Sequence, residues 1–178
     1  MLRKIAAPPR LDNCQSRRHH SVMLPKSPSA FRLRPAAPSD LDALLALENA
    51  TFTSDLLSRR RMRHWISAEN GLFVVAVDKS GVLAGYCLAF TRRDSDSVRA
   101  YSLAIAASAR GQGLGTLLFR DMEKRCRKAG FARIHLEVAH GNQVALGLYE
   151  KLGYFRVRSI REFYEDGKDA WRMEKVLG

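Results

Sequence analysis

The residues with the clearest chemical meaning lie between Ser102 and Arg120, where an apolar segment leads into a loop that contains Gly111, Gly113 and Gly115. An amphipathic helix is predicted directly after this loop. Backbone N–H groups at a helix start bind anions, and the positive end of the helix dipole adds to that attraction. The loop is therefore a candidate site for a phosphate-bearing ligand, and a glycine-rich turn without a ligand is the alternative.

Two common phosphate-binding loops do not match this segment. A P-loop has Lys and then Ser or Thr after its last glycine, whereas Thr116 and Leu117 follow Gly115 here. The dinucleotide pattern G-x-G-x-x-G needs a third glycine, and that position falls on Thr116 or on Leu118. Both interpretations are therefore poor.

A third pattern, Arg-x-x-Gly-x-Gly, does fit, with Arg110, Gly113 and Gly115. It resembles the acetyl-coenzyme A loop of the GNAT N-acetyltransferases. A second segment, residues 136–154, extends the resemblance to the RimI-type GNAT enzymes, which acetylate protein N-terminal amines. The matching residues of that segment are Leu136-Glu137-Val138, Asn142, Ala145, Leu148-Tyr149 and Gly153-Tyr154.

The resemblance covers about residues 31–178 and implies an α/β fold, a mixed, twisted sheet of about seven strands with helices on both faces. In this family acetyl-coenzyme A enters where two parallel strands part, here the strands at 103–105 and 134–138. The coenzyme would pair with the backbone of the first strand and place its pyrophosphate on the loop. The implied coenzyme-binding residues are Leu103, Ala104, Ile105, Arg110, Gly111, Gln112, Gly113, Leu114, Gly115 and Asn142.

The resemblance also suggests the groups that perform direct acetyl transfer. The attacking amine must lose a proton, the carbonyl must be polarised and the leaving thiolate must be protonated. By this resemblance Glu137 would be the general base, acting through water, and Tyr149 the general acid, with a backbone N–H near Ile105 polarising the carbonyl. Burial at a strand end would raise the pKa of the Glu137 carboxyl. The alternatives are a solvent-exposed carboxylate and a tyrosine of the core.

Composition limits the other classes of function. The net charge is +12, of which residues 31–178 hold only +7, and no nucleic-acid-binding motif is present. Three scattered cysteines and no His/Cys cluster favour a reducing, cytoplasmic setting without a metal site. No apolar run approaches the ~20 residues of a membrane span. A homodimer is left open.

Residues 1–30 are predicted to be a disordered basic tail, because they carry Pro, Ser and Arg without apolar periodicity. A targeting peptide and an over-extended start, with translation beginning at Met23, are the two explanations of such a tail. The domain is predicted at 31–178. Its elements are expected in the order strand, two helices, three strands, helix, strand, helix and two strands, and Ser39 with Asp42 is expected to cap the first helix.

Two charged clusters bear on the acceptor. Arg59, Arg60, Arg61 and Arg63 form either a solvated helix face or a basic wall for an acidic acceptor, and Glu162, Glu165, Asp166 and Asp169 form either a polar turn or a site for a cationic one. The chain also lacks the Pro-Trp-Ser of RimI-like enzymes. The leading hypothesis is acetylation of a protein N-terminal amine, with a small-molecule amine or a non-catalytic acyl-coenzyme A sensor as alternatives.

Overall fold

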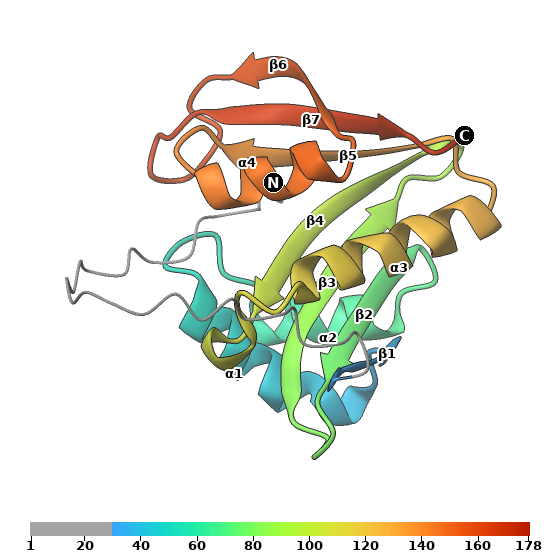
Figure 1. The fold of residues 1–178 in the computed structure, drawn as a ribbon, viewed down its shortest axis with the longest axis vertical. Helices are drawn as coiled ribbons and strands as arrows, with labels where there is room; N and C mark the ends of the chain where they lie inside the picture. The colour runs from blue at the N-terminus through green and yellow to red at the C-terminus, as the bar shows by residue number, and fades with distance from the viewer. Residues whose placement is uncertain (1–29) are drawn as a thin grey trace, which may run out of the picture.

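The computed structural model describes residues 30–178, so nearly all of the predicted basic tail lies outside the described residues. Seven strands alternate with four α-helices (Figure 1). The strands are β1 (Arg32–Pro35), β2 (Gly71–Val77), β3 (Leu83–Thr91), β4 (Ser97–Ile105), β5 (Arg133–Ala139), β6 (Phe155–Ile160) and β7 (Ala170–Val176). The helices are α1 (Leu41–Thr51), α2 (Arg59–Ser67), α3 (Leu114–Lys128) and α4 (Gln143–Lys151).

All seven strands form one mixed sheet in the order β1-β2-β3-β4-β5-β7-β6, and only the β4–β5 pair is parallel. That pair is short, because β4 and β5 are joined only from Ser97–Arg133 to Arg99–His135. Beyond these residues the two strands separate, and Figure 1 shows β4 running away from β5 toward the loop that precedes α3. The sheet therefore opens at its centre.

The helices cover the two faces of the sheet. Helices α3 and α4 pack on one face, where Leu118, Met122 and Tyr149 join a core with β-strand residues such as Leu136. Helices α1 and α2 pack on the opposite face, where Leu44 and other apolar residues form a second core. The predicted α/β class, element order and two-faced architecture are confirmed.

The start of the first helix differs from the expectation. Helix α1 begins at Leu41 after a 3₁₀ turn, and its N-cap is Asp40, whose side chain makes no cap hydrogen bond to the helix. Asp40 instead accepts hydrogen bonds from Ala37 N and from the guanidinium of Arg34. The predicted capping box of Ser39 and Asp42 is therefore wrong, because a proline-initiated turn shifts the cap by one residue.

Membrane-spanning helices and metal-binding clusters can be assessed for residues 30–178 only. No helix within residues 30–178 is long and apolar enough to cross a membrane. Across the same residues, no group of three or more His, Cys, Asp or Glu side chains could hold a metal ion. Cys87 and Cys126 are buried free thiols, and burial raises the pKa of each, to about 12 for Cys126.

Candidate active site

The glycine loop forms an uncapped start for α3. Gly113, the N-cap residue, has φ +76° and Gly111 has φ +71°, a left-handed conformation that side chains other than glycine rarely adopt. The N-cap provides no side chain to accept hydrogen bonds from the first turn, and that turn contains no acidic residue. The N–H groups at Leu114, Gly115 and Thr116 are therefore available to an anionic ligand at the positive end of the helix dipole.

Strand β4 presents a free backbone edge beside this loop. Ala106 N donates to Ala84 O at 2.8 Å, so the alternation of an antiparallel pair directs the backbone groups of Ala104 toward Tyr86 of β3. The backbone groups of Leu103 and Ile105 then point away from β3, into the gap left by β5. These two residues can pair with an extended ligand, whereas Ala104 already uses its backbone within the sheet.

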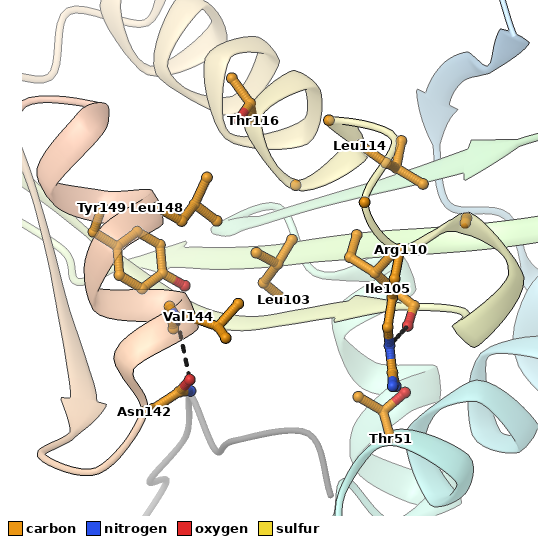
Figure 2. Close-up of a pocket in the computed structure, with 15 residues that line it drawn as sticks. Thr51, Leu103, Ile105, Arg110, Leu114, Thr116, Asn142, Val144, Leu148 and Tyr149 are labelled. Atoms are coloured by element: carbon orange, nitrogen blue, oxygen red, sulfur yellow. Dashed lines mark hydrogen bonds between the residues drawn. The ribbon is translucent and has the colours of Figure 1, made fainter. Parts of the chain in front are cut away.

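A cavity of about 290 Å³ lies between the α3 start, the free edge of β4 and helix α4. Figure 2 shows Leu103 and Ile105 on its floor, with α4 on one side and the glycine loop on the other. Arg110 projects along the cavity, and its Nε donates to Ile105 O at 3.3 Å. A Cβ on Gly115 would lie 3.3 Å from Leu148 Cδ2, so this glycine keeps the helix start close to α4 without a clash.

Helix α4 and its N-cap residue supply two of the polar side chains of the cavity, Asn142 and Tyr149. The side chain of Asn142 caps α4, because its Oδ1 accepts from Ala145 N at 3.1 Å. Tyr149 is fully buried against Phe119 and Tyr154, with ring centroids 4.9 and 5.9 Å away. Its hydroxyl points into the cavity in Figure 2 and has no hydrogen-bond partner among the described residues. Burial raises the pKa of Tyr149 well above 10, so the hydroxyl stays protonated at neutral pH.

These features fit acetyl-coenzyme A. The uncapped N–H groups suit a pyrophosphate, the free edge of β4 suits an amide-containing chain, and the unpartnered hydroxyl of Tyr149 offers a hydrogen-bond donor at the far end of the cavity. A buried polar group without a partner is costly in a folded protein. A ligand atom that accepts a hydrogen bond from the Tyr149 hydroxyl would remove this cost.

Most of the predicted coenzyme-binding residues line this one cavity, and two do not. Ala104 faces the α1–α2 side of the sheet, and Gln112 turns outward to donate to Ser108 O. The sequence interpretation missed Thr51, at the end of α1, and Val144, which is 78% exposed beside the cavity. Val144 was detectable as an exposed apolar residue next to the predicted cap Asn142, whereas Thr51 carries no local signal.

Glu137 lies on the opposite face of β5 from α4, two residues beyond the last residue that pairs with β4. It is 2% exposed, so the solvent-exposed alternative is wrong. Its Oε2 accepts from Arg99 Nε at 2.8 Å, and its Oε1 accepts from Arg172 Nε at 3.1 Å and Nη2 at 2.7 Å. Two guanidinium groups therefore hold the carboxylate in one orientation, a contact pattern that the sequence did not indicate.

Glu137 forms part of the wall of a groove of about 790 Å³ between α2, the β3–β4 turn and the β6–β7 hairpin. Trp65 and Phe90 stack on one side of it with centroids 4.6 Å apart. His135 lies within it, and its Nδ1 is 2.7 Å from Ser97 Oγ. Burial, followed by the charge of Arg172, lowers the pKa of His135 to about 4, so this imidazole is neutral at pH 7.

The two charged clusters singled out from the sequence are peripheral to this groove. The arginines of α2 are exposed and do not line it, and Arg59 pairs with Asp42 at 2.6 Å. Of the acidic turn only Glu162 reaches the groove, whereas Asp166 pairs with Lys168 and Asp169 accepts from Glu162 N. The clusters therefore fit a solvated helix face and a polar turn.

Comparison with known proteins places this geometry among acetyltransferases. The profile of the acetyltransferase (GNAT) family matches residues 41–154. A protein of Bacillus subtilis (strain 168), provisionally named as a ribosomal protein bS18-alanine N-acetyltransferase, is 32% identical over 132 residues, which are 74% of this chain and 85% of the relative. An N-alpha-acetyltransferase of Sulfurisphaera tokodaii is 26% identical over 163 residues, 85% of this chain and 96% of that protein.

A solved structure supports the fold independently. The ribosomal-protein-S18-alanine N-acetyltransferase from Escherichia coli superposes with a TM-score of 0.73 at 24% identity, covering 83% of this chain and 94% of that one. At this identity the likeness concerns the fold. The seven-stranded mixed sheet with helices on both faces thus matches the fold of a solved acetyltransferase.

Proposed function

Because the chain belongs to the GNAT family of acetyltransferases, and is an N-acetyltransferase, we propose that its acceptor is the α-amine at the N-terminus of a protein. The observation that carries this proposal is the two-sided opening of the sheet. A cavity of about 290 Å³ lies on the α3–α4 side, beside the glycine loop, and a groove of about 790 Å³ lies on the opposite side of the sheet, next to α2. The relatives named for N-terminal acetylation support the same acceptor.

In this proposal the α3 side of the opening holds the coenzyme. The N–H groups of the loop from Arg110 to Gly115 bind its pyrophosphate, and the backbone of Leu103 and Ile105 aligns the extended part of the molecule. Acetyl-coenzyme A supplies an acetyl group activated as a thioester. Asn142 caps α4 and so sets the position of Tyr149 relative to that group.

Proton transfer is assigned to the two side chains that flank the opening. Glu137 takes the proton of the acceptor amine through a water molecule, and Tyr149 donates a proton to the leaving sulfur. The raised pKa of Tyr149 suits a donor, because it keeps the hydroxyl protonated. The contacts from Arg99 and Arg172 occupy the acceptor positions of Glu137, so one of them has to open when the acceptor binds.

The acceptor α-amine is chemically favoured over an internal lysine. An α-amine has a pKa of about 7.7–8.0, against about 10.4 for lysine, so more of it is already neutral at pH 7. A carboxylate that acts through water therefore removes a proton more easily from an α-amine than from a lysine amine. This reasoning supports N-terminal transfer independently of the relatives' names.

The test is an acetylation assay on paired peptides that share an internal lysine and differ in whether the N-terminus is free or blocked. A panel of polyamines, aminoglycosides and amino acids is run beside them, and mass spectrometry locates the acetyl group. We expect transfer to the free α-amine alone. Acetylation of blocked peptides, or of the small amines only, would overturn the proposed acceptor.

A further inference from the structure

The groove beside Glu137 carries more positive charge than proton transfer by Glu137 requires. Five arginines and two glutamates line it. Its arginines are Arg92, Arg99, Arg158, Arg161 and Arg172. Arg99 and Arg172 are committed to Glu137, and neutral His135 adds no charge at pH 7. The remaining three guanidinium groups leave the groove with an excess of positive charge.

Those three arginines are available to a ligand. Arg92, Arg158 and Arg161 are exposed, and none of them forms an ion pair within residues 30–178. They come from separate segments, the β3–β4 turn, strand β6 and the start of the β6–β7 turn. The packing of a single element does not explain why three arginines without an ion pair converge on one groove from different elements.

One pairing in the sheet points to an anion more directly. Arg158 of β6 lies directly opposite Arg172 of β7 in the antiparallel register, next to an irregularity between Arg156 and Arg158. Like charges directly opposite one another destabilise a strand pair. Glu137 pairs with Arg172 and Arg99 but not with Arg158, so the charge of Arg158 is left without a compensating carboxylate among residues 30–178. An anion held between the groove arginines would remove the remaining repulsion.

The aromatic side of the groove strengthens such an interaction. Trp65 and Phe90 stack with an interplanar angle of 10°, and the Arg99 guanidinium lies 5.9 Å from the Phe90 ring. Apolar walls exclude water, and electrostatic attraction is larger where the surroundings are less polar. The guanidinium fork also matches a planar carboxylate.

We propose that this groove binds a carboxylate of the acceptor, so that the enzyme prefers acceptors with an acidic group close to the reacting amine. The inference rests on the proposed function and names the acceptor class for the same opening. A groove of about 790 Å³ is larger than one amino acid requires, since cavities of roughly 300–1,000 Å³ hold drug-sized ligands. An N-terminal peptide with Asp or Glu in its first few residues is therefore favoured over a free acidic amino acid.

The experiment compares peptides that share one N-terminal residue and carry Glu, Gln or Lys at each of the next three positions, with free glutamate as a separate arm. We expect kcat/KM for the best Glu peptide to exceed that of its Lys counterpart about 10-fold or more, the factor for one charge-assisted hydrogen bond. The difference should shrink at 0.5 M salt relative to 0.05 M, because salt screens charges in an open groove.

Single-residue variants locate the effect. Arg158→Ala and Arg161→Ala should each reduce the Glu-over-Lys ratio several-fold, chiefly through KM, while the Gln peptide changes little. Arg93→Ala is the matched control, because Arg93 is an exposed neighbour of Arg92 in the same turn and does not line the groove. Equal loss of preference in the Arg93 variant would mean that net charge alone acts, and would overturn the groove assignment.

Binding and turnover separate this inference from the proposed function. Fluorescence anisotropy with labelled Glu and Lys peptides measures binding without chemistry. Acidic peptides that bind through Arg158 and Arg161 but are not acetylated would support the groove and contradict the proposed acceptor. Peptides acetylated without regard to charge would contradict the groove and leave the proposed acceptor standing. Preference for free glutamate over every Glu peptide would overturn the assignment to peptides.

Discussion

The two sides of the central opening are built from different parts of the chain, and each would recognise its proposed ligand with different groups. The coenzyme cavity is built largely from one stretch, β4, the glycine loop and the α3 start, and it offers backbone N–H groups and apolar side chains. The groove proposed for the acceptor draws charged side chains from the β3–β4 turn, β4, β5 and the β6–β7 hairpin, and α2 adds Trp65. The two lie on opposite faces of the sheet, beside the place where β4 and β5 part (Figure 1).

This difference separates coenzyme binding, which a family can share, from acceptor choice, which can differ between its members. Backbone groups bind a ligand whatever side chains surround them, so a family can keep one coenzyme site through many changes of sequence. Side chains from distant segments can be exchanged one at a time, which alters acceptor choice without disturbing the coenzyme. The contrast predicts that changes on the two sides have separable effects on turnover, coenzyme affinity and stability.

The largest effect is expected where the cavity meets the reacting atoms. Tyr149→Phe removes the proposed proton donor and keeps the ring on Phe119, so kcat should fall about 10²–10⁴-fold while coenzyme affinity is retained. Tyr154→Phe is the control, because Tyr154 packs on the same Phe119 and does not line the cavity. Single-turnover kinetics and calorimetry measure the two quantities. Unchanged kcat in the Tyr149 variant would leave a structural role only.

The next effect concerns coenzyme affinity. Gly113→Asp places a carboxylate at the α3 N-cap, where it takes up the free N–H groups and repels phosphate, so the Kd for acetyl-coenzyme A should rise on the order of 10-fold or more. Gly81→Asp is matched to it, because Gly81 has φ +82° in the β2–β3 turn and lies outside the cavity. Calorimetry should show weaker binding only in the first variant. Equal affinities in both would contradict the anion site.

A smaller effect is expected on the groove side, as a dependence of stability on pH. The pKa of His135 is lowered to about 4 from 6.5, so between these values the unfolded chain binds a proton that the folded chain does not. Stability conferred by the neutral ring is present above pH 6.5 and is lost as the pH falls toward 4. On acidification the Tm of the His135→Gln variant should fall about 2–4 °C less than the Tm of the wild type, allowing for screening of a partly accessible ring.

Thermal melts between pH 7.5 and 4.5 measure this difference. His64→Gln is the control, since His64 is exposed on α2. Wild type and the His135 variant losing the same number of degrees would show that the imidazole is protonated as easily in the folded protein as in the unfolded chain.

The smallest effect is expected from the segment that precedes the described residues. A chain that begins at Met23 should keep its melting temperature and its acetyl-transfer rate, because residues 1–22 lack the apolar periodicity needed to pack on a domain. Differential scanning calorimetry and the peptide assay compare the two lengths. A drop of several degrees, or loss of turnover, would mean that this segment contributes to the domain.

The order of elements and the position of the glycine loop could be predicted because their signals are local. Alternating apolar residues mark β1 and β5, a continuous apolar run marks β2, and i to i+4 spacing marks α3, with Gly113 and Gly115 in the turn before it. The error at α1 has the same origin. Ser39 and Asp42 satisfy the cap pattern, but Asp40 is drawn to Arg34 by a contact that the local pattern does not include.

By itself the sequence determined the strand–loop–helix unit and predicted its ligand class, because the groups proposed to bind the coenzyme are mostly consecutive and mostly backbone. Only the tertiary structure decided that Glu137 is buried between Arg99 and Arg172, which lie 38 and 35 residues away. Those contacts depend on the register of β4, β5 and β7, and a shift of one residue would turn each side chain to the other face. The acceptor groove is therefore a property of strand pairing, which no single segment encodes.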